Sequence, residues 1–373
     1  MKQGRPIFDA DAHVQEPHTM WSDYIDPALR DEIVTGPDSL LRVGGHPTVD
    51  SWRTDHLSDE QRREMRPLEM IEKYGDLALR HFDPAAMVEG FDAEGIDVAA
   101  LFPSFGLYVP WADDLAPELA TGLARAYHRW IAEFCSYAPD RLVPVGVAPL
   151  HDPQLTAHEV LRAVDQHGIK AFMLRPNPVQ GRAIDDVAHD RFFSVVADAG
   201  VPLILHEGTG ARVAATGADR FDTWCGRHVA SHPLEQMLGM ASLVFGGVLE
   251  RHPRLKVGFF ESGSGWLPYW LHRMDEHHEH WGHGDYPELT LRPSEYFARQ
   301  CVISTESDDP HARLTVESVG ADHVVWASDF PHPESQWPHA VDNFIGPDHA
   351  GLTPDDEHQV LWTTPCALYG LEP

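Results

Sequence analysis

Near its start the chain reads Pro6-Ile-Phe-Asp-Ala-Asp-Ala-His13, a short apolar run that ends in acidic residues and a histidine. Two later apolar runs end in a similar way, one in His206-Glu207 and the other in Asp329. In a barrel of parallel strands, the residues that follow such runs gather at one end of the barrel. Imidazole and carboxylate groups gathered there can hold a metal ion. The sequence therefore predicts a metal site built from strand ends.

The order of the expected elements predicts the fold class. Short β-branched runs alternate with amphipathic helical stretches, which is typical of a parallel sheet with crossover helices. About eight such units in one long chain favour a closed (β/α)8 TIM barrel. The expected strands are 7–11, 98–102, 142–148, 170–174, 201–205, 256–260, 302–304 and 324–327. The expected helices are 84–94, 117–137, 153–166, 190–199, 233–251, 267–280 and 311–319.

Two segments interrupt this alternation. Residues 17–80 form a long insertion after the first strand, and residues 208–231 form a long loop after the fifth. Long loops in compact domains often serve as lids or substrate walls, and plain surface elaboration is the alternative. No repeat, low-complexity tract or linker divides the chain. We therefore predict a single domain over residues 1–373, with the insertion as an active-site wall or an interface.

Composition argues against several kinds of partner. The chain has 28 Lys and Arg against 58 Asp and Glu, a formal net charge of −30. This charge repels nucleic acid and anionic membrane surfaces, so the expected partner is a small-molecule substrate. No apolar stretch approaches the roughly 20 residues that cross a bilayer, and no signal peptide precedes the first strand. Four scattered cysteines indicate a reduced, cytoplasmic protein. A homodimer is expected only because such oligomers are common.

The strand-end motifs resemble those of the amidohydrolase superfamily, in the branch called amidohydrolase-2, which includes metal-dependent hydrolases and aromatic acid decarboxylases. The resemblance runs from Phe8 to Leu371. It is carried by Asp9-Ala-Asp-Ala-His-Val-Gln-Glu-Pro17, Leu205-His-Glu-Gly208, Ser262-Gly-Ser-Gly-Trp-Leu-Pro268, Ser328-Asp-Phe-Pro-His332 and Leu361-Trp-Thr-Thr-Pro365. The resemblance implies a (β/α)8 barrel. It also implies a divalent metal, which we expect to be zinc, manganese or iron, held by Asp11, His13, His206 and Asp329.

Some residues depart from the family pattern. Asp11 stands where many members have the first histidine of a His-x-His pair, and Glu261 ends the sixth strand where many have a catalytic histidine. The fourth strand ends in Arg175, so a zinc pair bridged by a carboxylated lysine is not expected. Glu261 has three interpretations: a general acid or base, a further metal ligand, or a strand-end carboxylate bonded to loop amides or to Arg175.

Four further residues are candidates for the site. His232 is expected to open a helix and either points into the site or is incidental. Arg175 either binds a substrate carboxylate or pairs with a neighbouring glutamate. Phe105 and Trp266 are expected to line an apolar substrate pocket or to belong to the core.

Two further features are less favoured as metal ligands: the acidic residue Glu306 and a histidine-rich segment. Glu306 could reach the metal, but a solvated loop acid is the favoured interpretation. The histidines of segment 277–283 resemble a metal tract, but they end a polar helix and are expected to be a solvated face.

Three functions compete. The leading one is hydrolysis or decarboxylation of a small carboxylic or carbonyl substrate, with Asp329, Glu261 and His232 as catalytic residues. The second is a non-haem iron oxygenase, with two irons in a carboxylate-rich site. The third is a barrel without catalysis that only binds. The substrate itself is not readable from the sequence.

Overall fold

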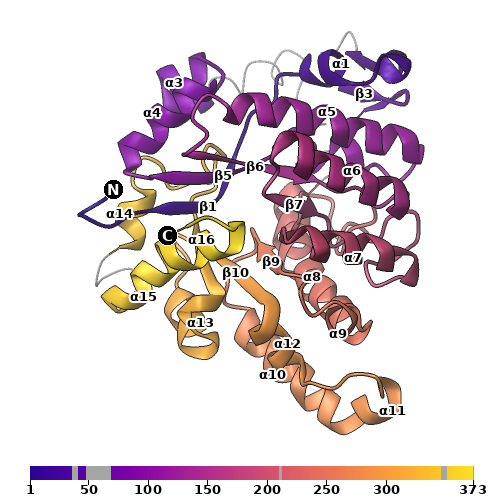
Figure 1. Ribbon diagram of the computed structural model, residues 1–373. Helices are drawn as coiled ribbons and strands as arrows, with labels where there is room; N and C mark the ends of the chain where they lie inside the picture. Colours follow the sequence, from indigo (N-terminus) through magenta and orange to yellow (C-terminus); the bar gives the residue numbers. More distant parts are fainter. Residues whose placement is uncertain (36–40, 48–68, 210–211, 346–350, 373) are drawn as a thin grey trace.

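A computed structural model describes residues 1–35, 41–47, 69–209, 212–345 and 351–372. Its centre is an eight-stranded sheet in the order β1-β5-β6-β7-β8-β9-β10-β11 (Figure 1). Every neighbouring pair in this order is parallel. The strands are β1 (Phe8–His13), β5 (Val98–Phe102), β6 (Leu142–Val147), β7 (Ala171–Leu174), β8 (Leu203–His206), β9 (Val257–Phe260), β10 (Cys301–Glu306) and β11 (Val324–Ala327).

Hydrogen bonds join the two edges of this sheet. The backbone N–H of His13 donates to the carbonyl oxygen of Phe330 at 2.7 Å, and that of Asp329 donates to Asp11 at 3.1 Å. The backbone N–H of Ser328 also donates to Asp9 Oδ1 at 3.0 Å. The end of β1 is thus tied to the residues that follow β11. The predicted (β/α)8 TIM barrel is confirmed, because the strands are parallel, their edges meet and helices separate them along the chain.

Helices follow the strands and cover the barrel (Figure 1). Their ends carry the signals that the sequence suggests: the Asp152 side chain accepts from the backbone of Gln154, and Gly168 ends the same helix in the left-handed conformation. The helices are α1 (Met20–Tyr24), α3 (Asp76–Leu79), α4 (Pro84–Glu94), α5 (Pro117–Cys135), α6 (Pro153–His167), α7 (Asp190–Ala199), α8 (Trp224–Phe245), α9 (Val248–Arg251), α10 (Leu267–His277), α11 (His283–Asp285), α12 (Pro293–Gln300), α13 (Ala312–Val319), α14 (Ala340–Phe344), α15 (Pro354–His358) and α16 (Thr364–Tyr369).

The prediction for the helix after the fifth strand was wrong at its start. The predicted helix begins at residue 233, whereas α8 begins at Trp224 and contains Pro233 in its interior. The Thr223 side chain caps the helix by accepting from the backbone N–H of Gly226. Proline is common at the first helical position, and this preference misled the prediction. The predicted loop over residues 208–231 is correspondingly shorter.

The first described part of the insertion lies beside α5, whereas its last part, which includes α3, contacts α4. Helix α1 packs beside α5, with Tyr24 Oη donating to Glu133 Oε2 at 2.8 Å. A small antiparallel sheet follows, formed by β2 (Ile33–Thr35), β3 (Leu41–Val43) and β4 (His46–Pro47). Residues 36–40 and 48–68 of the predicted insertion lie outside the described residues. Among the described helices, none is long and apolar enough to cross a membrane.

Candidate metal and active site

Asp11 and His13 project from the end of β1, which carries an irregularity in register between Asp9 and Ala12. Irregularities of this kind re-aim side chains near active sites. The Nδ1 atom of His13 lies 2.8 Å from the carbonyl oxygen of Pro103. This contact assigns the proton to Nδ1 and leaves the lone pair on Nε2. His13 Nε2 then faces Asp11 Oδ1 at 3.5 Å and Asp329 Oδ1 at 3.2 Å.

His206 ends β8 and is oriented in the same manner. Its Nδ1 atom lies 2.8 Å from the carbonyl oxygen of Glu207, so its Nε2 atom is the free ligand. That nitrogen lies 3.5 Å from Asp11 Oδ2 and 2.8 Å from Glu261 Oε2. Residues from four strand ends therefore converge, as the sequence predicts.

Glu261 directly follows β9, and Asp329 lies two residues after the end of β11. Their φ angles are 53° and 56°, a left-handed backbone conformation that residues other than glycine seldom adopt. Such a conformation costs about 1–3 kcal/mol and gathers at functional sites. The fold holds it here at two positions whose carboxylates both face the histidines of the barrel mouth.

The donor set fits a divalent metal. Five buried ligand atoms converge here: Asp11 Oδ1, His13 Nε2, His206 Nε2, Glu261 Oε2 and Asp329 Oδ1. Among the described residues their polar neighbours are mainly one another and His332, as in the 2.8 Å contacts of Glu261 with His206 and of Asp329 with His332. Buried polar atoms without other partners cost stability, and a bound cation removes that cost. Asp11, His13 and His206 offer ligand atoms within 4.8 Å of one another. A mixture of imidazole and carboxylate at such spacing suits Zn²⁺, Mn²⁺ or Fe²⁺.

The pKa shifts of the buried groups also favour a bound cation. Burial raises the pKa of Asp11 above its ordinary value, although His206 opposes the shift. Burial lowers the pKa of His13 well below its ordinary value, with His332 and His206 adding to the effect. Burial also raises the pKa of Asp329 to about 7. Without a cation these three groups resist charging, whereas His206 and Glu261 form an ion pair in which, against the opposing effect of burial, the carboxylates raise the pKa of His206 and His206 lowers the pKa of Glu261. A divalent ion at the centre would replace the proton on His206 and favour the ionised carboxylates and neutral imidazoles that bind metals.

His332 belongs to this cluster but was not among the predicted site residues. Its Nδ1 atom lies 2.8 Å from Asp329 Oδ1, its Nε2 atom lies 2.8 Å from Ser104 Oγ, and its ring stacks on His13 at 3.9 Å. His13, Asp329 and His332 form a second group of ligand atoms within 4.8 Å. Its position three residues after Asp329, within Ser328-Asp-Phe-Pro-His332, is the signal that could have found it.

His232 reaches the site from inside α8, and the prediction that it opens a helix was wrong. Its Nδ1 atom lies 2.9 Å from the carbonyl oxygen of Glu261, and its Nε2 atom lies 3.5 Å from Glu207 Oε2. Glu306 ends β10 and is not a solvated loop acid. Burial, followed by the charges of Asp309 and Asp329, raises its pKa to about 8.

A cavity of about 840 Å³ opens above the cluster. Its polar walls include Glu261, His232 and His332 of the barrel mouth and Glu69 of the insertion. Its apolar walls include Phe105 and, from the insertion, Met70 and Ile71. Trp266 is not among the lining residues; it donates through Nε1 to Ser262 Oγ at 3.2 Å. The cavity is lined by Gln15, Glu16, Pro17, His18, Glu69, Met70, Ile71, Ala78, Leu79, His81, Phe82, Ser104, Phe105, Leu107, Tyr108, Gly208, Thr209, Trp224, His228, His232, Glu261, His332, Pro333 and Glu334.

Arg175 bonds the lining residues Leu107 and Gly208 from behind the cavity wall and is only 1% exposed. Its guanidinium donates to Glu207 Oε1 at 2.6 Å, to the carbonyl oxygens of Leu107 and Gly208, and to Asn177 Oδ1. It does not line the cavity. The ion pair with Glu207 matches one of its two interpretations, and a role in binding a substrate carboxylate stays a prediction.

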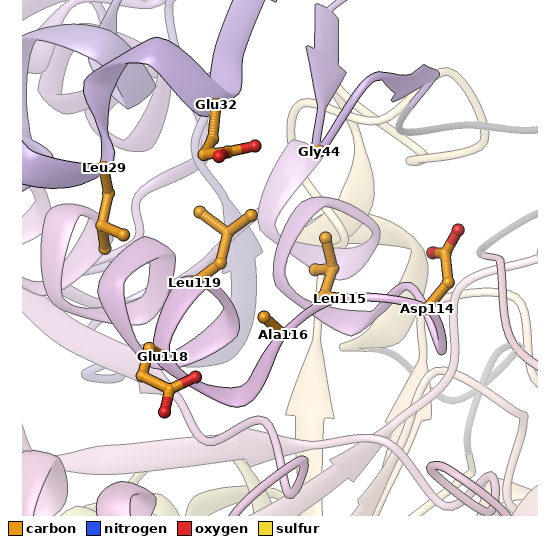
Figure 2. Close-up of a pocket in the computed structure, with 8 residues that line it drawn as sticks. All are labelled: Leu29, Glu32, Gly44, Asp114, Leu115, Ala116, Glu118 and Leu119. Atoms are coloured by element: carbon orange, nitrogen blue, oxygen red, sulfur yellow. The ribbon is translucent and has the colours of Figure 1, made fainter.

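A second, smaller hollow of about 370 Å³ lies between the insertion and the start of α5 (Figure 2). Leu29, Leu115 and Leu119 give it an apolar wall, and its polar side chains are the carboxylates of Glu32, Asp114 and Glu118. Its lining includes neither histidine nor cysteine. We assign no chemistry to this hollow, so the cavity at the barrel mouth is the candidate site.

Comparison with known proteins places the chain in a family. The model of the amidohydrolase family, in its amidohydrolase-2 form, matches residues 9–371. The chain belongs to the amidohydrolase-2 family. It is 26% identical over 257 residues to the 2-amino-3-carboxymuconate-6-semialdehyde decarboxylase of Dictyostelium discoideum, an alignment that covers 68% of this chain and 67% of the relative.

Two solved structures of this amidohydrolase-2 fold resemble the chain along nearly its whole length. An amidohydrolase from Mycobacterium avium subsp. paratuberculosis superposes with a TM-score of 0.74 at 19% identity, over 99% of each chain. The 5-carboxyvanillate decarboxylase of Novosphingobium aromaticivorans, solved with manganese, superposes with a TM-score of 0.72 at 20% identity, over 99% of this chain and 97% of that one. Both share its barrel.

The amidohydrolase-2 chain described here is thus an enzyme that hydrolyses or decarboxylates a small carboxylic or carbonyl substrate with the help of a metal. The named relatives include decarboxylases and no oxygenase. The alternative of a non-haem iron oxygenase is therefore not supported, and neither is a barrel that only binds.

Proposed function

We propose that the chain is a decarboxylase of a hydroxylated aromatic acid, and that it uses a divalent ion, Mn²⁺ by preference, bound at the strand-end site. The observation that carries the proposal is the convergence of buried ligand atoms from Asp11, His13, His206 and Asp329 at the strand ends. Two relatives support the choice of reaction. The relative that is similar in sequence is a decarboxylase, and one of the relatives that is similar in structure is a decarboxylase solved with manganese.

Non-oxidative decarboxylation breaks the bond between a ring carbon and its carboxylate. Carbon dioxide leaves, the bonding electrons stay on the ring carbon, and a proton takes the vacated position. When bound, the ion would polarise the substrate's oxygen atoms and stabilise the negative charge that develops. The cavity of about 840 Å³ is large enough for an aromatic acid, and Phe105 offers an aromatic wall.

The proton requires a residue that faces the cavity. Asp329 and His332 form the best-placed pair, since Asp329 Oδ1 lies 2.8 Å from His332 Nδ1 and His332 lines the cavity. We assign to this pair the proton that the ring carbon receives. Glu261 would act as a further ligand, and His232 would hold it in place through the contact with its carbonyl oxygen.

The insertion would form one wall of the substrate site. Described residues of the segment 17–80 line the cavity, among them Glu69, Met70, Ala78 and Leu79. This role gives the insertion a function in substrate selection, which barrel loops commonly have.

The direct test is release of CO₂ from a panel of hydroxybenzoic acids by protein loaded with Mn²⁺. We expect about one CO₂ per substrate consumed, no uptake of oxygen, and loss of the reaction after chelation. Substrate consumption without CO₂ release would contradict the proposal and favour hydrolysis.

A further inference from the structure

The strand-end site contains more ligand residues than one cation needs. Three groups of described residues offer ligand atoms within 4.8 Å of one another: Asp11, His13 and His206; His13, Asp329 and His332; and His228, His232 and Glu261. A single divalent transition metal takes about four to six ligands. The eight residues in these groups therefore exceed the requirement of one ion.

The third group comes from different elements. His228 and His232 lie on α8 four residues apart, so their side chains share one face of the helix. Their rings stack at a centroid distance of 4.1 Å. Two histidines at this spacing on a helix can bind the same ion. His232 is only 4% exposed, and its Nε2 atom has no hydrogen-bond partner among the described residues.

Glu261 lies between this group and the strand-end ligands. Its Oε2 atom is 2.8 Å from His206 Nε2, whereas its Oε1 atom is 3.7 Å from His232 Nδ1. The Nδ1 atom of His232 also bonds the Glu261 carbonyl oxygen, so His232 would bind an ion through Nε2, which has no hydrogen bond among the described residues. The Glu261 carboxylate thus contacts His206 through one oxygen and lies within ligand distance of His228 and His232. A carboxylate in this position can bridge two cations.

We propose that a second divalent cation binds beside the first, held by His228 and His232, with the carboxylate of Glu261 bridging the two ions. The inference rests on the proposed function for the first ion. His228, His232 and Glu261 line the cavity, whereas Asp11, His13 and His206 do not. The second ion would therefore lie at the cavity wall, beside the first.

The test is manganese content by ICP-MS, with EPR of the same samples, after equilibration with Mn²⁺ and removal of the excess. We expect about two Mn²⁺ per wild-type chain and the signal of a spin-coupled pair. His228→Ala should retain about one ion and show an uncoupled signal. His228→Asn provides a second variant in case the alanine substitution disturbs folding. His280→Ala combined with His283→Ala, at exposed positions, removes adventitious binding and should leave the count unchanged.

Failure of this inference is distinct from failure of the proposed function. One Mn²⁺ in the wild type that is lost in Asp11→Asn and retained in His228→Ala would overturn the second site alone. Absence of bound Mn²⁺ from the wild type would overturn both sites.

Discussion

Asp329 is the residue that links the metal cluster to the cavity. Its backbone is tied to β1, its carboxylate faces His13 Nε2 at 3.2 Å, and its other contact is His332. A residue in this position can serve both as ligand and as part of the proton-transfer pair. Its left-handed backbone also limits which substitutions are informative, because asparagine tolerates that conformation better than alanine does.

We therefore predict that Asp329→Asn folds normally but loses turnover by at least about 10²-fold, since it removes the carboxylate that would bind metal and hold the proton. Initial rates and circular dichroism measure the two effects. Asp322→Asn, at a largely exposed acid, is the matched control and should keep full activity. Full activity in Asp329→Asn would remove this residue from the reaction.

Arg175 and Glu207 form a buried ion pair behind the cavity wall, and we expect this pair to stabilise the fold. Arg175→Met leaves Glu207 buried without its partner, so we predict a loss of about 3–5 kcal/mol in the free energy of unfolding. Urea denaturation measures it. Arg313→Met breaks an exposed pair with Glu317 and should cost less than about 1 kcal/mol. A neutral effect of Arg175→Met on stability with a raised KM would instead support the clamp role.

At the scale of elements, α8 decides what reaches the site. It continues through Pro233, and its early turns carry His228 and His232 to the cavity. The sequence suggested a helix starting at Pro233 and therefore placed both histidines at or before its start. Thr223, a good N-cap nine positions earlier than His232, was the competing signal. The local sequence could not show whether the helix starts after Thr223 or at Pro233, because packing of the helix against the barrel decides where it starts.

Helices α5 and α6 are joined by a partly buried charge network. Glu159 accepts from Arg125 at 2.9 Å, from Arg162 at 2.6 Å and from His128 at 2.8 Å. Burial alone would raise the pKa of Glu159, but the hydrogen bonds from His128 and Arg162 outweigh it and hold the pKa well below its ordinary value. The network thus stabilises the ionised carboxylate in the folded state.

A depressed folded-state pKa means that this stability is present above the unfolded value of about 4.5 and is lost as pH falls below it. We predict that Glu159→Gln lowers the free energy of unfolding by about 2–4 kcal/mol at pH 7. The difference from the wild type should shrink on going from pH 5 toward pH 3. Urea titrations at several pH values measure it, with Glu317→Gln as an exposed control. A difference that does not vary with pH would contradict the assignment.

At the scale of the whole molecule, the barrel and the convergence of the proposed ligand residues could be predicted from sequence, because strand ends in a parallel barrel must meet. Asp11, His13, His206 and Asp329 converge for that reason. The contact of Ser104 with His332 could not be predicted, since it depends on where the loop after β5 turns. The position of Arg175 behind the cavity wall likewise depends on the tertiary position of Glu207, which the spacing of residues along the chain does not encode.

Metal removal should weaken the whole fold, because three carboxylates and two histidines would be left facing one another in a buried site. An ion that binds only the folded state adds about 3–4 kcal/mol when present at 100 to 1,000 times its dissociation constant. We predict a lower thermal midpoint after chelation and its recovery with Mn²⁺. His206→Ala should be much less sensitive to the chelator. Equal midpoints for metal-free and metal-loaded wild type would contradict the site.

The most direct test of the account is a crystal structure of the Mn²⁺-loaded protein with an anomalous difference map recorded at the manganese edge. We predict a peak about 2.0–2.3 Å from His13 Nε2, His206 Nε2 and the carboxylate oxygens of Asp11 and Asp329. A map with no peak at these residues, or with its only peak at the exposed His280 and His283, would contradict a metal centre at the strand ends.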